Sequence, residues 1–279
     1  MNPTREPLDV LYLMKQEMLR RGMSIRTIDT YIQCVRQFLQ WSNKDTRCIT
    51  SKDVKDYIDT FVDKNAPGNT INVHLNALKF LVEEVLNKRI MWRIRYSKVP
   101  KKLPDYLNKD EVVKLFSAIK NTKHLLLVKL MYSAGLRVSE TINLKVQDFD
   151  FENKLLFIRN GKGRKDRLCM IANELLLPLK EWISTSGLNP EDYLFGGQNG
   201  HLTSRTVQEI LKSASKDAKI RKVHPHMLRH SFATHLISNG CDVVSCQSLL
   251  GHASSETTMR YVHVASPTLI AVKSPLDTL

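Results

Sequence analysis

Four amphipathic helical patterns follow one another in residues 8–90, with no convincing strand pattern among them. The second pattern starts behind Ser24, a residue type suited to an N-cap, and its apolar positions recur at steps of three and four: Ile25, Ile28, Ile32, Val35, Phe38 and Leu39. Thr50 and Asp53 open the third pattern at the spacing of a capping box. The fourth follows the break at 66–68. The sequence therefore predicts a small helical bundle.

A basic, proline-bounded segment separates this bundle from the rest of the chain. Residues 88–102 hold seven Lys and Arg side chains and no acid, and Pro100 and Pro104 interrupt regular structure near its end. Such a run is often only a solvated surface. At 279 residues the chain is long enough for two domains, and we predict three parts up to residue 265: a helical domain over 1–90, a linker over 91–105 and a second domain over 106–265.

The charge of the chain indicates the class of partner. The formal net charge of +14 favours nucleic acid, ahead of an anionic membrane surface. The apolar runs are far shorter than the ~18 residues of a membrane span, and the first residues do not resemble a secretory signal. Five scattered cysteines without a C-x-x-C pair are typical of reduced thiols. We expect a cytoplasmic protein that binds double-stranded DNA and no membrane.

The second domain combines helices with one β-hairpin. Asn108 and Glu111 mark the start of a helix, and helices dominate again from Asn173 onward. Between them, β-rich runs at Leu155–Asn160 and Arg167–Ile171 flank a turn that contains glycine. The expected fold class is mainly α with a small β-sheet.

Four segments of this domain carry polar side chains that a fold alone does not require: Gly135–Glu140, the hairpin turn with Lys162, His226–His230, and Leu249–His252 followed by Tyr261. Each has an ordinary explanation when taken alone. Arg137 and Glu140 could form a helix-end ion pair, and Lys162 could only solubilise a turn. His226 could cap a helix, and Tyr261 could lie in the core.

The histidines are candidates for a metal site, because His226 and His230 stand four apart on a predicted helix, with His224 and His235 nearby. The glutamate of the zincin motif is missing from this spacing and no cysteine pair assists, so we expect no metal. We expect His230 and His235 to be structural. Gly161–Gly163 lacks the spacing of a P-loop, so no nucleotide cofactor is expected.

Taken together, an Arg, a Lys, His-x-x-Arg, a His and a Tyr in this order resemble the tyrosine recombinase (phage integrase-like) family, most closely its Xer group. The matching segments are AGLRVSE (134–140), GKGRKDR (161–167), HPHMLRHSFATHLISNG (224–240) and LLGHASSETTMRYVHV (249–264). The resemblance implies an N-terminal SAM-like core-binding domain and a C-terminal α+β catalytic domain. Its catalytic positions fall on Arg137, Lys162, His226, Arg229, His252 and Tyr261.

The resemblance also implies a reaction, in which Tyr261 forms a covalent 3'-phosphotyrosine and a 5'-hydroxyl is released. Two guanidinium groups suit the charge that accumulates on the phosphate oxygens during such an attack. Side chains expected to contact the DNA backbone are basic residues of the linker and the hairpin: Arg93, Arg95, Lys98, Lys101, Lys102, Arg164, Lys165 and Arg167. In the family, four protomers assemble on two DNA sites, and we expect residues 266–279 to dock on a neighbouring protomer.

Several functions fit this resemblance. The compact length favours a Xer-like role in resolving chromosome or plasmid dimers, with a DNA translocase as a conceivable activator, over the integrase of a mobile element. A type IB topoisomerase shares the chemistry but rejoins the original strand. A regulator that binds DNA without cutting it would need the positive charge but not the complete set of catalytic residues.

Overall fold

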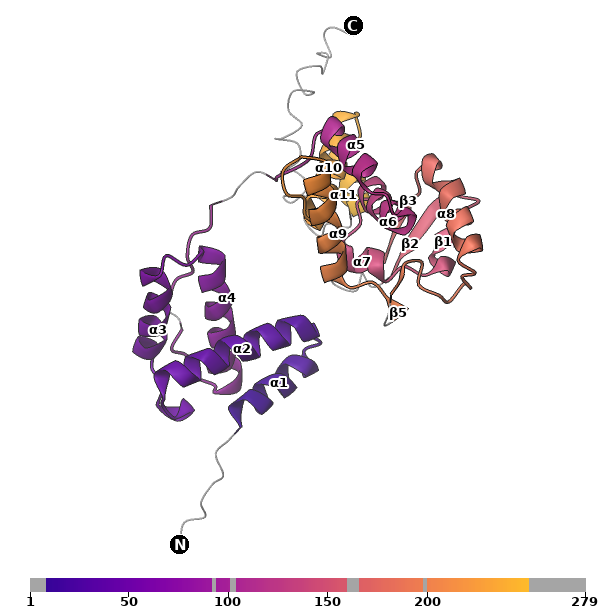
Figure 1. Cartoon of the computed structure of the whole chain (residues 1–279). Coiled ribbons are helices and arrows are strands. Elements are labelled where there is room, and N and C mark those ends of the chain that lie inside the picture. Colours follow the sequence, from indigo (N-terminus) through magenta and orange to yellow (C-terminus); the bar gives the residue numbers. More distant parts are fainter. Residues whose placement is uncertain (1–8, 92–93, 101–103, 160–165, 198–199, 251–279) are drawn as a thin grey trace, which may run out of the picture. The chain divides into compact units, whose positions relative to one another are not determined.

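A computed structural model of the chain describes residues 9–91, 94–100, 104–159, 166–197 and 200–250 (Figure 1). The chain divides into two compact units, Met1–Lys101 and Lys102–Leu279. The division falls inside the segment 91–105 where a linker is predicted. Each unit has its own hydrophobic core.

The N-terminal unit is a helical bundle, as expected from its four amphipathic patterns (Figure 1). Its elements are α1 (Val10–Arg20), α2 (Ile25–Ser42), the 3-10 turn η1 (Thr46–Cys48), α3 (Ser51–Asp63), α4 (Gly68–Lys79) and the π-helical turn η2 (Phe80–Val85). The predicted caps are present: Ser24 Oγ accepts from the Thr27 N–H, and Thr50 and Asp53 form a reciprocal capping box. Met14, Phe38 and Leu78 are completely buried in the core.

Part of the predicted linker packs against this bundle. Met91 is buried in the N-terminal core. The Asn72 side chain of α4 exchanges two hydrogen bonds with the backbone of Ser97, at 2.8 and 3.0 Å, and the Tyr96 hydroxyl donates to Asn76 Oδ1 at 2.8 Å. Residues 94–97 are therefore held by α4, and the stretch that joins the two units is shorter than the predicted 91–105.

The C-terminal unit combines helices with a small antiparallel sheet (Figure 1). Its helices are α5 (Lys109–Ala118), α6 (Thr122–Ser133), α7 (Val138–Ile142), the 3-10 turn η3 (Val146–Asp148), α8 (Asn173–Thr185), α9 (Ser204–Asp217), α10 (Pro225–Ser238) and α11 (Val243–Leu250). The strands β1 (Phe149–Asp150), β2 (Leu155–Ile158) and β3 (Arg167–Met170) lie in the order β1-β2-β3, and β4 (Gly196–Gly197) pairs with β5 (Gly200–His201).

The predicted hairpin is present as β2 and β3, which pair in antiparallel register from Leu155 opposite Met170 to Ile158 opposite Arg167. Its turn, residues 160–165, lies outside the described residues. Strand β1 and the β4-β5 pair are two residues long in each strand, and the sequence did not predict them. The fold class, mainly α with a small sheet, is confirmed.

Helix α10 contacts α6, α9 and α11. Pro225 starts it at a position where a missing N–H costs nothing, and Met227 and Leu228 are completely buried. Helix α6 contributes Leu127 and Leu130, which are equally buried. This packing fixes the backbone that carries His226 and Arg229.

Candidate active site

Arg137 stands at a tight turn between α6 and α7. Gly135, two residues earlier, has a φ of +59°, and a Cβ at this position would lie 2.4 Å from the Phe232 ring on α10. Glycine is therefore required for both the left-handed conformation and the close approach. The turn places Arg137 at the N-terminus of α7, where its N–H donates to Glu140 Oε2 at 2.8 Å.

Glu140 binds two arginine side chains in a nearly dry environment, with 4% of its side chain exposed. Arg137 Nη1 donates to Glu140 Oε1 at 2.7 Å. Arg167 of β3 binds the same carboxylate with both terminal nitrogens, Nη1 to Oε1 at 2.8 Å and Nη2 to Oε2 at 2.7 Å. We call Arg137, Glu140 and Arg167 the arginine–carboxylate cluster.

The Glu140 carboxyl is charged at neutral pH despite its burial. Burial by itself would raise its pKa, but the hydrogen bonds and charge of Arg167, followed by the bonds from Arg137, lower the pKa to about 2. One carboxylate thus faces two guanidinium groups, so the cluster keeps an excess positive charge. Arg137 uses Nη1 on Glu140, and a guanidinium has five N–H donors, so donors remain for an oxyanion.

The prediction that Arg167 contacts the DNA backbone does not agree with its position in the structure. Its side chain is 8% exposed, with both terminal nitrogens on Glu140 and Nε donating to the Leu249 carbonyl at 3.1 Å. The reason is strand geometry: Arg167 and Cys169 lie on the inward face of β3, whereas Leu168 and Met170 between and after them are exposed. Of the other predicted contacts, Arg95 and Lys98 are exposed, and Arg93, Lys101, Lys102, Arg164 and Lys165 lie outside the described residues.

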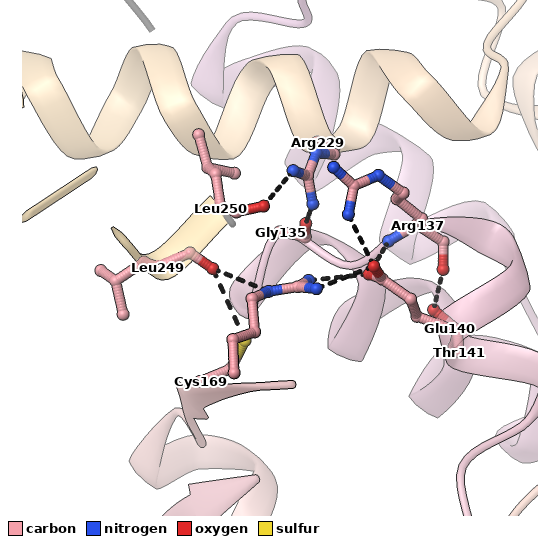
Figure 2. A network of polar contacts seen from close by, with 9 residues as sticks. Gly135, Arg137, Glu140, Thr141, Cys169, Arg229, Leu249 and Leu250 are labelled. Atoms are coloured by element: carbon pink, nitrogen blue, oxygen red, sulfur yellow. Dashed lines mark hydrogen bonds and ion pairs between the residues drawn. The ribbon is translucent and has the colours of Figure 1, made fainter. Parts of the chain in front are cut away.

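Arg229 of α10 reaches the same turn (Figure 2). The residue is 3% exposed, its Nη1 donates to the Gly135 carbonyl at 2.6 Å, and its Nη2 donates to the Leu250 carbonyl at the end of α11. Two of the predicted catalytic residues, Arg137 and Arg229, are therefore brought together around one turn.

His226 lies at the exposed start of α10, one helical turn before His230. Their rings are stacked with centroids 6.3 Å apart. Burial, followed by the charges of His226, His224 and Arg229, lowers the pKa of His230 to about 4. His235 has a structural contact, a hydrogen bond of 2.9 Å between its Nδ1 and the Tyr132 hydroxyl.

Lys162, His252 and Tyr261 lie outside the described residues. The described segments next to Lys162 and His252 in the chain nevertheless contribute contacts to the site. Strand β3, which follows the turn with Lys162, contributes Arg167 to the cluster. Helix α11 ends at Leu250, two residues before His252, and its last carbonyls accept from Arg167 and Arg229 (Figure 2).

In the described part of the chain, no three His, Cys, Asp or Glu side chains form a group that could hold a metal ion. Among the same residues, no helix combines the length and apolar character needed to cross a bilayer.

Comparison with known proteins decides the family. The model of the phage integrase family matches residues 105–267, and that of the phage integrase N-terminal SAM-like domain matches residues 11–92. The chain is also 38% identical over 252 residues to the tyrosine recombinase XerA of Pyrococcus furiosus, covering 88% of this chain and 86% of the relative. The chain belongs to the phage integrase family of tyrosine recombinases. The predicted family is confirmed.

Further similarities place the recombinase near the Xer enzymes. It is 35% identical over 259 residues to a tyrosine recombinase of Thermosipho africanus, covering 88% of this chain and 91% of the relative. The crystal structure of the XerH site-specific recombinase, bound to its palindromic difH substrate after cleavage, matches with a TM-score of 0.73 and 27% identity. That match covers 90% of this chain and 80% of XerH. The recombinase is thus an enzyme of site-specific recombination, which cleaves and rejoins DNA.

Proposed function

We propose that this recombinase exchanges DNA strands through a covalent 3'-phosphotyrosine on Tyr261. The phenolic oxygen attacks the scissile phosphorus, a phosphotyrosine ester forms, and the 5'-oxygen leaves as a hydroxyl. The 5'-hydroxyl of a second strand then attacks the same phosphorus and releases Tyr261. The observation that carries the proposal is the meeting of Arg137, which keeps donors for an oxyanion, and Arg229 at the Gly135 turn, because the combined positive charge of the two guanidinium groups can stabilise one phosphate.

Each remaining residue of the motif either transfers a proton or binds a phosphate oxygen. Lys162 gives a proton to the leaving 5'-oxygen, and His226 takes the proton of the Tyr261 hydroxyl. His252 donates a hydrogen bond to the scissile phosphate. The exposure of His226 at the start of α10, one turn before the buried Arg229, supports its access to a bound strand.

We further propose that four protomers assemble on two duplex sites and resolve chromosome or plasmid dimers in the cytoplasm, as a Xer-like enzyme does. Residues 266–279, which lie outside the described residues, would dock on a neighbouring protomer. Deleting 266–279 should then reduce tetramer formation on DNA, measured by light scattering, while a single protomer still binds one half-site. Tetramers of unchanged abundance would contradict the exchange of this tail.

The target site is first identified by sequencing the DNA that is trapped covalently on the protein in its host. The proposed reaction is then tested on a plasmid that carries two copies of this site. Site-specific exchange predicts two product circles from sites in direct repeat. Relaxation of supercoils without product circles would favour a topoisomerase. Joining of a site to unrelated DNA in preference to a second copy of the site would favour the integrase of a mobile element. A parallel reaction with an added DNA translocase tests whether the recombinase needs an activator.

A further inference from the structure

Arg167 lies in the site but is not one of the six residues of the catalytic motif. It lies on β3, the strand that follows the turn with Lys162, and its guanidinium is buried between two partners. Both terminal nitrogens bind Glu140, and Nε binds the Leu249 carbonyl at the end of α11. One side chain thus joins the strand of the hairpin, the carboxylate beneath Arg137 and the helix that leads to His252.

We propose that Arg167 is a positioning residue for strand cleavage: it holds the Glu140 carboxylate that orients Arg137, and it fixes the end of α11 against β3. The proposal rests on the proposed function, since it takes Arg137 as a phosphate-binding group. Arg167 itself touches no DNA, because its donors face Glu140 and Leu249 in the interior of the domain.

The geometry of the shared carboxylate supports this role. Each Glu140 oxygen accepts two bonds, one from Arg137 and one from Arg167. With Arg167 in place, Arg137 is bound to one oxygen by its side chain and to the other by its backbone N–H. Without Arg167, both oxygens lose a partner, and the Arg137 guanidinium can turn to occupy them as a bidentate pair. That turn would move Arg137 away from the phosphate.

Arg167 also sets the charge of the cluster, and for this reason the test below uses Arg167→Lys, which keeps that charge. Two guanidinium groups and one carboxylate leave one net positive charge for a phosphate. A pair of Arg137 and Glu140 alone would be neutral and would attract a phosphate more weakly. Lysine cannot replace Arg167, because an ammonium group does not present the planar fork that binds two carboxylate oxygens and a carbonyl together.

The test compares Arg167→Lys with wild type on a nicked duplex target site, with DNA affinity measured separately from the single-turnover rate of covalent adduct formation. We expect the rate to fall by about 10- to 100-fold, as misplacement of a catalytic group does, while the Kd for DNA changes by less than about threefold. Arg159→Lys is the matched control, since Arg159 directly follows β2 of the same sheet and pairs with Asp148 with 61% of its side chain exposed. This control should cleave at the wild-type rate.

Two further variants keep the result interpretable. Arg167→Ala leaves a buried space, and millimolar guanidinium should restore part of its cleavage rate; the same addition should not help Arg159→Ala. The double variant Arg167→Lys/Glu140→Gln should lose no more than the more damaged single variant, because both substitutions act through the same carboxylate.

Three outcomes would overturn the proposal: a wild-type cleavage rate for Arg167→Lys, a Kd that rises in step with the loss of rate, or fully multiplicative losses in the double variant. An absence of adduct with the wild-type enzyme would instead reject the proposed function. The two failures are therefore distinguishable.

Discussion

Arg229 Nη1 donates to the carbonyl oxygen of Gly135 at 2.6 Å, and this contact joins the second turn of α10 to the turn that precedes Arg137. The two arginines come from segments 92 residues apart in the chain (229 minus 137) and share one piece of backbone. Any change to that turn should alter both guanidinium positions together.

The first prediction concerns the turn itself. Gly135→Ala adds a Cβ at a left-handed position 2.4 Å from a Phe232 ring carbon, so it combines backbone strain with overpacking. We expect a loss of about 2–4 kcal/mol in the free energy of unfolding, measured by urea denaturation. Gly187→Ala is the control, because Gly187 has a similar φ of +61° but nothing within 4 Å of the added Cβ. Equal losses for the two variants would contradict the close contact with Phe232.

The second prediction concerns the shared carboxylate. Glu140→Gln removes the negative charge between Arg137 and Arg167, which leaves buried guanidinium groups uncompensated and should cost about 3–5 kcal/mol at pH 7. The folded-state pKa of Glu140 is lowered from 4.5 to about 2, so its stabilisation is complete above pH 4.5 and is lost as the pH falls toward 2. The difference between wild type and Glu140→Gln in urea unfolding should therefore shrink below pH 4.5. A difference independent of pH would count against a charged Glu140.

The third prediction concerns His230, whose pKa in the fold is lowered from 6.5 to about 4. Between these two pH values His230 is protonated in the unfolded chain and neutral in the folded chain. The free energy of unfolding therefore falls as the pH decreases from 6.5 toward 4. His230→Gln removes this proton uptake. We expect the variant to lose about 2 kcal/mol less than wild type between pH 7 and pH 4.5, as followed by thermal or urea unfolding. His226, His224 and Arg229, whose positive charges lower the pKa, and Asp105, which raises it, are unchanged in the comparison.

The fourth prediction concerns the basic segment before the second domain. Arg95 and Lys98 are exposed, and we expect both to neutralise DNA phosphates. Replacing both by alanine should reduce the slope of log Kobs against log salt concentration by about 2. The charge-conserving pair Arg95→Lys/Lys98→Arg should keep the wild-type slope. An unchanged slope in the alanine variant would place these two side chains away from the DNA.

Much of the fold follows from local sequence patterns. The steps of three and four in α2, the caps at Ser24 and Thr50, and the β-rich runs of β2 and β3 are all short-range signals, and the structure has these elements where the patterns predict them. The two-residue strands β1, β4 and β5 escape such reasoning, because a strand of two residues is too short to show the alternation from which a strand is predicted.

The sequence predicts the candidate site only in part. The order of the motif identified Arg137 and Arg229 but could not reveal that Gly135 accepts from Arg229. The basic neighbours of Arg167 predict a contact with the DNA backbone, whereas the structure has it in a buried ion pair. The alternation of β3 carries the missing signal, since Arg167 shares a face with the buried Cys169, and an arginine on that face needs buried acceptors such as the Glu140 carboxylate.

The central claim is that Tyr261 attacks DNA, and the most direct measurement is the identity of the residue joined to a trapped strand. Protein incubated with a nicked target duplex should give an adduct stable in sodium dodecyl sulfate, with the 3'-phosphate on Tyr261 by peptide mass spectrometry and a free 5'-hydroxyl on the released end. Tyr261→Phe should bind the same DNA and give no adduct. An adduct that survives Tyr261→Phe, or a nucleotide mapped to another residue, would contradict the account.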